Sequence, residues 1–342
     1  MKILITGGCG FVGSNLAIYL KKKKFKVYSL DNLFRKGSKQ NLLRLKNEGI
    51  SNFKIDIRFN SKIKKLPKFD LIIDACAEPS VNTYLNDIDR LFSTNFSGTL
   101  NILKKCVADN SKLIFLSTSR VYSLKYLNSL IKKKKLKKKI KPKKIFTDMK
   151  SPTIGAKSLY GFSKFASEEL IKEFSYIKDL NYLINRFGVI AGPWQFGKVD
   201  QGFFSLWIWR HLTKQKLSYN GFGGNGFQIR DVIHIDDVCR LIYLQIKKIK
   251  KIYNKSFIAG GGVRNALSLK DLTLISQKMT KNKIKISKNP HTSYYDVPYF
   301  VISNKEIKKF YNWEPKKNIE EIANDIYSWQ LNNFNIIKKY FN

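Results

Sequence analysis

The sequence predicts an α/β fold built on a doubly wound parallel sheet, together with a smaller mixed C-terminal domain. Short apolar runs recur along the chain, separated by longer patterns with apolar residues at three- and four-residue spacing. The short runs do not alternate with polar residues, which is typical of strands that helices bury on both faces. With 342 residues, of which 43% are hydrophobic, the chain is long enough for one large or two ordinary domains.

The position of each expected element follows from these patterns. Strands are expected over KILIT (2–6), KVYSL (26–30), FKI (53–55), DLIID (70–74), KLIFL (112–116), NYLIN (181–185) and KSFIA (255–259). Helices are expected over residues 15–23, 91–107, 159–174 and 236–249. After Arg186 the pattern is less regular, and segments such as GFGGNGF are typical of loops that build binding surfaces.

The chain is strongly basic, with a formal net charge of +39. Such a charge attracts nucleic acids, anionic membranes and phosphorylated molecules. The lysines are scattered and come with abundant Ile, Asn, Phe and Tyr, a mix that AT-rich coding would produce, so we expect no nucleic-acid partner. The lysine-rich segment 124–150 is expected to be a solvated surface insertion, because runs of like charge repel each other.

The sequence favours neither a metal site, nor a disulfide framework, nor a membrane segment. The four cysteines are well separated and form no CxxC pair, and the three histidines also lie apart. Glycines interrupt the first apolar stretch and lysines follow it, the wrong order for a secretory signal. No uncharged apolar segment reaches about 20 residues. These patterns predict a cytoplasmic protein with reduced thiols.

A glycine-rich turn, TGGCGFVG, follows the first expected strand and precedes the first expected helix. It fits Gly8-x-Gly10-x-x-Gly13 or Gly7-x-x-Gly10-x-x-Gly13. Both patterns place bare backbone against a pyrophosphate at a helix N-terminus. The turn therefore predicts a dinucleotide site.

Asp31 ends the second expected strand, where a carboxylate would accept hydrogen bonds from the adenosine ribose and repel a 2′-phosphate. This favours NAD over NADP. Arg35 and Lys36 lie close in the sequence and weaken the argument, and as a plain turn residue Asp31 would be compatible with both cofactors. The same topology predicts that Asp56 and Ile57 reach the adenine, and that the small segment 75–77 lets the cofactor pass.

The segment SLYGFSK places Tyr160 and Lys164 four residues apart at the start of a helix, hence on one face. A phenol with a pKa near 10 is a poor base at neutral pH. A neighbouring ammonium and a nicotinamide cation would both favour the phenolate. Thr118 lies in STSRVYS, where a strand leaves the sheet, and could hold a substrate oxygen beside Tyr160. The same spacing also occurs by chance in purely structural helices.

With these motifs in order, the chain resembles the extended short-chain dehydrogenase/reductase family, which contains the NAD-dependent nucleotide-sugar epimerases and dehydratases. The resemblance runs from KILITGGCGFVGSNLA to YNWEPKKNIEEIANDIYSW and covers nearly the whole chain. It implies a Rossmann-type NAD-binding domain of residues 1–188 plus 231–259. It also implies a nucleotide-sugar-binding domain of 189–230 plus 260–342.

The resemblance implies roles for individual residues. Thr118, Tyr160 and Lys164 match the family's catalytic triad, and Arg230 in QIRDVIHIDDV matches the arginine that grips the substrate diphosphate. The sugar nucleotide would be bound by Ser80, Thr118, Gln201 and Arg230. The helices that begin near Asn95 and Tyr160 match the pair that forms the family's homodimer. The cofactor would contact Gly7, Gly10, Phe11, Val12, Gly13, Asp31, Asn32, Asp56, Ile57, Ala75, Cys76, Ala77, Asn95, Tyr160 and Lys164.

The residues after Thr118 distinguish reactions within the family. Sugar 4,6-dehydratases carry an Asp-Glu pair there and decarboxylases a glutamate, whereas this chain has Ser119 and Arg120. Epimerisation through a transient keto-sugar is therefore the simpler fit. DNLFRKGS, FGKVDQG and QIRDVIHIDD look most like the branch that inverts C2 of CDP-sugars. The alternatives are a UDP-sugar 4-epimerase or keto-sugar reductase of the same fold, and a non-catalytic nucleotide- or RNA-binding regulator.

The chain departs from the family pattern in several places. Asp74 ends the fourth expected strand, where the family often has histidine, and Tyr122-Ser123 replaces the usual Tyr-Gly. Glu78 stands close to the expected sugar site. It could be an extra acid or a partner of a sugar hydroxyl, but a solvated or arginine-paired carboxylate is favoured.

Overall fold

The computed structural model describes residues 1–79, 87–131, 146–197 and 202–341. Ser80 and Gln201, both assigned to the sugar nucleotide from the sequence, lie outside the described residues, as does most of the segment 124–150. The chain divides into two compact units. The first consists of Met1–Val121, Leu159–Arg186 and Cys239–Phe257, and the second of Tyr122–Ser158, Phe187–Val238 and Ile258–Asn342.

These bounds differ from the domains expected from the sequence. Residues 122–158, 187–188, 231–238 and 258–259 fall in the second unit. The ranges expected from the sequence put them in the first domain, with 124–150 as an insertion. The assignment of the cofactor to one unit and of the sugar nucleotide to the other stays a prediction.

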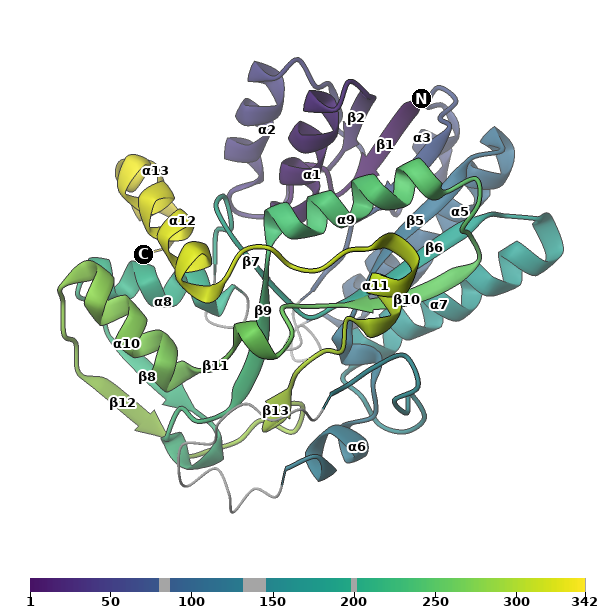
Figure 1. Cartoon of the computed structure of the whole chain (residues 1–342). Helices are drawn as coiled ribbons and strands as arrows, with labels where there is room; N and C mark the ends of the chain where they lie inside the picture. The colour runs from purple at the N-terminus through teal and green to yellow at the C-terminus, as the bar shows by residue number, and fades with distance from the viewer. Residues whose placement is uncertain (80–86, 132–145, 198–201, 342) are drawn as a thin grey trace. The chain divides into compact units, whose positions relative to one another are not determined.

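The first unit is built on a seven-stranded sheet, which confirms the predicted α/β fold with a parallel sheet (Figure 1). The neighbouring pairs β1–β2, β1–β4, β2–β3 and β4–β5 are all parallel. The core residues of β1 and β4 are buried, as their uninterrupted apolar sequences require. In sheet order the strands are β10 (Lys255–Ala259), β6 (Tyr182–Phe187), β5 (Lys112–Thr118), β4 (Leu71–Asp74), β1 (Lys2–Thr6), β2 (Lys26–Leu30) and β3 (Asn52–Phe53).

Helices of this unit form two groups. In one, α1 (Phe11–Lys22) packs against α2 (Ser38–Asn47), and Tyr19 of α1 meets Tyr243 of α9 (Ile235–Lys248), with 6.2 Å between ring centroids. In the other, α5 (Gly98–Asp109) packs against α3 (Asn60–Lys64) and α7 (Leu159–Lys178). The β1–β2 and β4–β5 connections run in opposite directions along the sheet. Right-handed crossovers therefore place α1 and α5 on opposite faces.

The helix expected over residues 91–107 is interrupted. It consists of α4 (Ile88–Phe92), a π-helical turn η2 (Ser93–Ser97), and α5. The apolar spacing in the sequence does not distinguish a π turn from a regular helix, because the extra residue is absorbed within one turn. π turns are frequent at functional sites, and this one contains the buried Asn95.

The second unit is mixed. Its central strand β9 (Ile229–His234) pairs in parallel with β7 (Val189–Ala191) and β13 (Tyr299–Phe300), and antiparallel with β11 (Ala266–Ser268). The strands β8 (Leu217–Asn220) and β12 (Ile286–Asn289) form a separate parallel pair. The helices are α6 (Leu124–Ser129), α8 (Phe203–Leu212), α10 (Leu269–Thr280), α11 (Lys305–Tyr311), α12 (Ile319–Asn332) and α13 (Phe334–Phe341).

Two helices of the second unit begin with capping boxes. Ser268 accepts from the backbone of Asp271 at the start of α10, and Asn318 does the same for Glu321 at the start of α12. With α8, these helices bury a core that includes Phe204, Trp207, Leu272, Ile322 and Ile326. Among the described residues, no helix has the length and apolar character needed to span a membrane.

Candidate functional site

The residues assigned to the cofactor lie where β1, β2 and β4 end. The strand register pairs Thr6 with both Leu30 and Asp74, so the three strands end level with one another. The chain then leaves the sheet at Gly7, Asp31 and Ala75. In an open parallel sheet, ligands bind at this carboxyl edge.

A groove at this edge collects most of these residues. Nine residues assigned to NAD from the sequence line it: Gly7, Gly10, Asp31, Asn32, Asp56, Ile57, Ala75, Cys76 and Ala77. Phe11, Val12 and Gly13 form the first turn of α1, which starts directly after the lining residue Gly10. The remaining lining residues are Leu30, Phe34, Arg35, Ser38, Ile55, Arg58, Glu78, Arg90 and Thr94.

The glycine turn has the geometry that a pyrophosphate needs. Gly10 precedes α1, and no side chain of the described residues caps this helix, so its first N–H groups are available to an anion. A Cβ atom at Gly13 would lie 2.2 Å from the carbonyl oxygen of Gly7, so only glycine allows the helix to approach the turn this closely. The residues at this turn therefore fit a dinucleotide.

Asp31 is held by backbone groups. Its carboxylate accepts hydrogen bonds from the N–H of Cys9 at 3.1 Å and of Leu33 at 2.8 Å. Burial raises the pKa of Asp31 above its ordinary value, while these two hydrogen bonds and the charge of Arg35 lower it. The carboxylate is thus fixed in the groove, in the place expected of a ribose acceptor.

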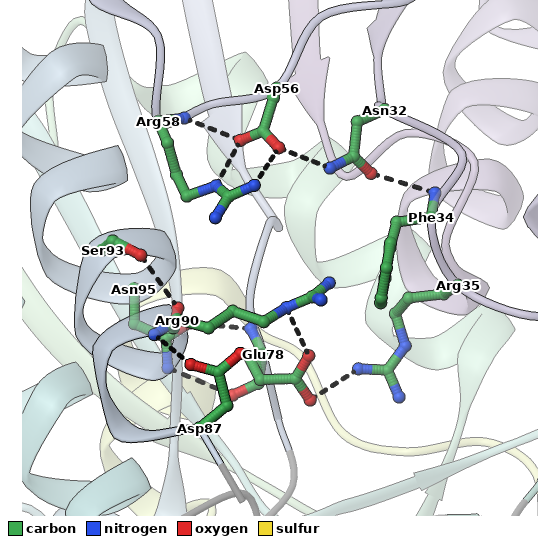
Figure 2. Close-up of polar contacts among 10 residues, drawn as sticks. All are labelled: Asn32, Phe34, Arg35, Asp56, Arg58, Glu78, Asp87, Arg90, Ser93 and Asn95. Atoms are coloured by element: carbon green, nitrogen blue, oxygen red, sulfur yellow. Dashed lines mark hydrogen bonds and ion pairs between the residues drawn. The ribbon is translucent and has the colours of Figure 1, made fainter.

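Asp56 is paired with Arg58, a residue that sequence analysis did not identify. Arg58 donates from Nε to Oδ1 at 2.9 Å and from Nη2 to Oδ2 at 2.8 Å, and Asn32 donates to Oδ2 at 2.9 Å (Figure 2). The hydrogen bonds from Arg58 lower the pKa of Asp56 to about 2. The only sequence signal was the close spacing of Asp56 and Arg58 beyond a strand, which is also ordinary loop composition.

Asn95 fixes the segment that follows β4. Its side chain accepts from the N–H of Glu78 at 2.7 Å and donates to the carbonyl of Glu78 at 3.1 Å and to Ser163 at 3.0 Å. Asn95 is fully buried, so the structure gives it a positioning role. The side chain of Glu78 is paired with Arg35 and Arg90, which is one of the arrangements that the sequence favoured (Figure 2).

The hydroxyls of Thr118 and Tyr160 meet at the end of β5. They share a hydrogen bond that lowers the pKa of Tyr160, as do the charges of Arg120 and Arg35. Burial has the larger effect and raises this pKa, so its net direction is opposite to the shift toward the phenolate that the sequence suggested. A Cβ atom at Gly161 would lie 2.2 Å from the carbonyl oxygen of Arg120. This close approach sets Tyr160 beside Thr118.

Lys164 lies one helical turn after Tyr160 and is buried. Its Nζ atom lies 3.7 Å from the centroid of the Phe115 ring. Burial lowers the pKa of Lys164 to about 8, against an opposing effect of the charge of Asp74. Asp74 itself is buried and accepts hydrogen bonds from Thr6 at 2.6 Å and Thr99 at 3.1 Å. Lys164 can therefore change between its charged and neutral forms near ordinary pH.

In the second unit, Arg230 lies on β9. Its Nη2 donates to Asp296 Oδ1 and to the carbonyl of Val297, both at 2.6 Å. The guanidinium is thus held by this unit's own residues. Among the residues that the structure describes, no three His, Cys, Asp or Glu side chains gather where they could hold a metal ion.

Comparisons with known proteins identify the family of the chain. Residues 3–259 match the model of the NAD-dependent epimerase/dehydratase family. The CDP-paratose 2-epimerase of Salmonella typhi is 30% identical, over 96% of this chain and 99% of that protein. The UDP-glucuronate 4-epimerase of Thermodesulfobacterium geofontis is 26% identical, over 98% of each.

The fold is shared with solved structures. The crystal structure of UDP-glucose 4-epimerase from Thermotoga maritima, with UDP-glucose, is similar with a TM-score of 0.82. It is 24% identical and covers 98% of this chain and 100% of that one. The family assignment rests on the match over residues 3–259, which covers most of the chain. The chain belongs to the NAD-dependent epimerase/dehydratase family.

Proposed function

We propose that the protein is an NAD-dependent nucleotide-sugar epimerase, similar to the CDP-paratose 2-epimerase of Salmonella typhi. The observation that carries the proposal is the hydrogen-bonded pair of Thr118 and Tyr160, with Lys164 one turn along the same helix. A purely structural helix has no need of this arrangement at the carboxyl edge of a parallel sheet. The relatives named above support the reaction class.

In this proposal, bound NAD supplies the group that accepts and returns a hydride. Tyr160 removes the proton from the reacting sugar hydroxyl and later returns it. Thr118 orients the same oxygen through its hydroxyl, and the positive charge of Lys164 favours the phenolate. Because burial raises the pKa of Tyr160, proton transfer depends on the hydrogen bond with Thr118 and on the charges of Arg120 and Arg35, which lower it.

Arg230 stays the proposed ligand of the substrate diphosphate. Its guanidinium is already oriented by Asp296 and the Val297 carbonyl, which would reduce the entropy lost on binding. The preference for a CDP-sugar and for inversion at C2 rests on similarity to the Salmonella typhi enzyme. A UDP-sugar 4-epimerase is the second candidate, because relatives with that activity match nearly the whole chain.

We also propose a homodimer through α5 and α7. Several large apolar side chains on or next to these helices are exposed, which favours a covering partner: Ile88, Val107, Phe162, Tyr176 and Ile177. A second copy of the chain is the natural partner, because the matching helices of this family form its dimer.

Replacing Tyr160 with Phe tests the proposal. Tyr160→Phe should lower kcat by about a thousandfold or more, because the proton acceptor is lost, while nucleotide-sugar affinity changes little. Turnover is measured by NMR and mass spectrometry of products from a panel of CDP-, UDP- and GDP-sugars.

The control is Tyr253→Phe in the loop after α9, where the tyrosine is 43% exposed and kcat should not change. Wild-type turnover in Tyr160→Phe would place the chemistry elsewhere. Stoichiometric consumption of added NADH by the wild type would identify a reductase instead.

A further inference from the structure

The groove is lined by three arginines and three carboxylates. The lining includes Asp31, Asp56 and Glu78 together with Arg35, Arg58 and Arg90, so the formal charges cancel. The whole chain has 64 basic and 25 acidic residues, and a groove with average composition would therefore be positive. The groove is a neutral site in a strongly basic protein.

Glu78 contacts two of these arginines. Its Oε1 accepts from Arg35 Nη1 at 3.1 Å, and its Oε2 lies 3.9 Å from Arg90 Nε (Figure 2). The side chain of Glu78 is only 14% exposed, so this pairing is screened less than a surface ion pair. Asn95 fixes the backbone of Glu78 from both its N–H and its carbonyl.

The two arginines come from different elements. Arg35 lies in the loop after β2, four residues beyond Asp31, and Arg90 lies on α4. Arg90 also stacks on Phe34, with its Cζ 3.4 Å from the ring centroid. Glu78 thus contacts both guanidinium groups, and Phe34 packs against that of Arg90.

An arginine near a ribose acceptor is the group that recognises a 2′-phosphate, because its fork binds phosphate oxygens. Arg35 stands in that position, yet its charge is directed to Glu78. We propose that Glu78 determines cofactor selectivity by occupying Arg35 and Arg90, so that the groove does not accept the 2′-phosphate of NADP. This inference rests on the proposed placement of the dinucleotide in the groove.

Glu78→Gln tests the inference by removing the charge while nearly keeping the shape. Binding is measured by calorimetry with 5′-AMP, 2′,5′-ADP, NAD and NADP on the full chain. The affinity for 2′,5′-ADP and NADP should rise by about tenfold or more, because two arginines lose their anionic partner beside a doubly charged phosphate. The affinity for 5′-AMP and NAD should change less than about threefold.

Two further variants test which residues cause the change in affinity. Adding Arg35→Gln and Arg90→Gln to Glu78→Gln should return the affinity for 2′,5′-ADP to about the wild-type value. The matched control is Glu169→Gln on α7, where Glu169 forms an exposed pair with Lys172 and no affinity should change. If Glu78→Gln does not fold, Glu78→Ala tests the same loss of charge.

The outcomes separate the inference from the proposed function. Unchanged discrimination in Glu78→Gln, with NAD still bound, overturns the inference alone. A gain that persists without both arginines also overturns it. A wild type that binds neither 5′-AMP nor NAD overturns the placement of the dinucleotide, and the selectivity role with it.

Discussion

Asp231 is a buried carboxyl group on β9 that connects three segments of the second unit. Its Oδ2 accepts from the N–H of Gly262 at 2.8 Å and of Ile302 at 3.3 Å, and Asp231 is fully buried. Burial raises its pKa to about 6, although these hydrogen bonds lower it. The ionised form is therefore costly in the folded state.

The pH dependence of stability follows from this shift. The folded pKa of Asp231 lies above its ordinary value of 3.8, so its contribution to stability is fully present below pH 3.8 and is lost as the pH rises through about 6. At neutral pH the loss amounts to about 3 kcal/mol. Asp231→Asn keeps an oxygen acceptor and cannot ionise. The unfolding free energy of Asp231→Asn, relative to that of the wild type, should therefore increase between about pH 4 and pH 7.

Tryptophan fluorescence can follow this change, because all five tryptophans belong to the second unit. Unfolding of both proteins is measured across the pH range. Glu314→Gln is the control, since Glu314 is exposed and paired with Lys308. Parallel pH profiles for Asp231→Asn and the wild type would contradict the buried-carboxyl account.

At the scale of the elements, the start of α7 and the short helix η3 (Ser119–Val121) are set by Gly161. No side chain other than hydrogen fits there, because a Cβ atom would also lie 3.3 Å from the Cβ of Arg120. The contact determines how far Tyr160 stands from Thr118. A helix boundary thus controls the proposed catalytic geometry.

Gly161→Ala should separate these elements. Alanine is ordinarily about 1 kcal/mol better than glycine within a helix. Here the clash should instead cost about 1–3 kcal/mol and lower kcat by about tenfold or more. Thermal melting and steady-state kinetics measure both effects. Glu173→Ala, at an exposed position on α7, should leave them unchanged, and an equally unaffected Gly161→Ala would show that the contact is not limiting.

The sequence predicted the buried strands well. KILIT, KVYSL and KSFIA coincide with β1, β2 and β10, because strands covered on both faces leave an uninterrupted apolar signal. It did not predict β7, β11 or β13, which are too short to show a period. It also missed β8, β9 and β12 of the second unit. It also placed Tyr160 and Lys164 at the start of a helix, and Asp31 at the end of a strand. It could not find the contact of Arg90 with Glu78, since that depends on tertiary structure alone.

At the scale of the whole molecule, the net charge of +39 is not focused on the groove. The lining carries no lysine, and its arginines are matched by carboxylates. A charge spread over the surface attracts polyanions without specificity, and this attraction weakens with salt.

RNA binding should therefore be weak and non-specific. With a short single-stranded RNA we expect a Kd of about 10 µM or weaker near physiological salt, rising steeply with salt concentration and unaffected by NAD. Fluorescence anisotropy with two unrelated RNA sequences measures this. Tight, sequence-dependent binding that NAD displaces would instead favour the RNA-binding regulator.

The π-helical turn at Ser93–Ser97 has a consequence for how this chain can change during evolution. Removing one residue from it would make the helix regular, but would rotate everything beyond by about 100°. Either Asn95 would leave Glu78, or the buried side of α5 with Ile102 and Cys106 would face the wrong way. Descendants of this protein should accept substitutions at the exposed Ser97 far more readily than any gain or loss of length there.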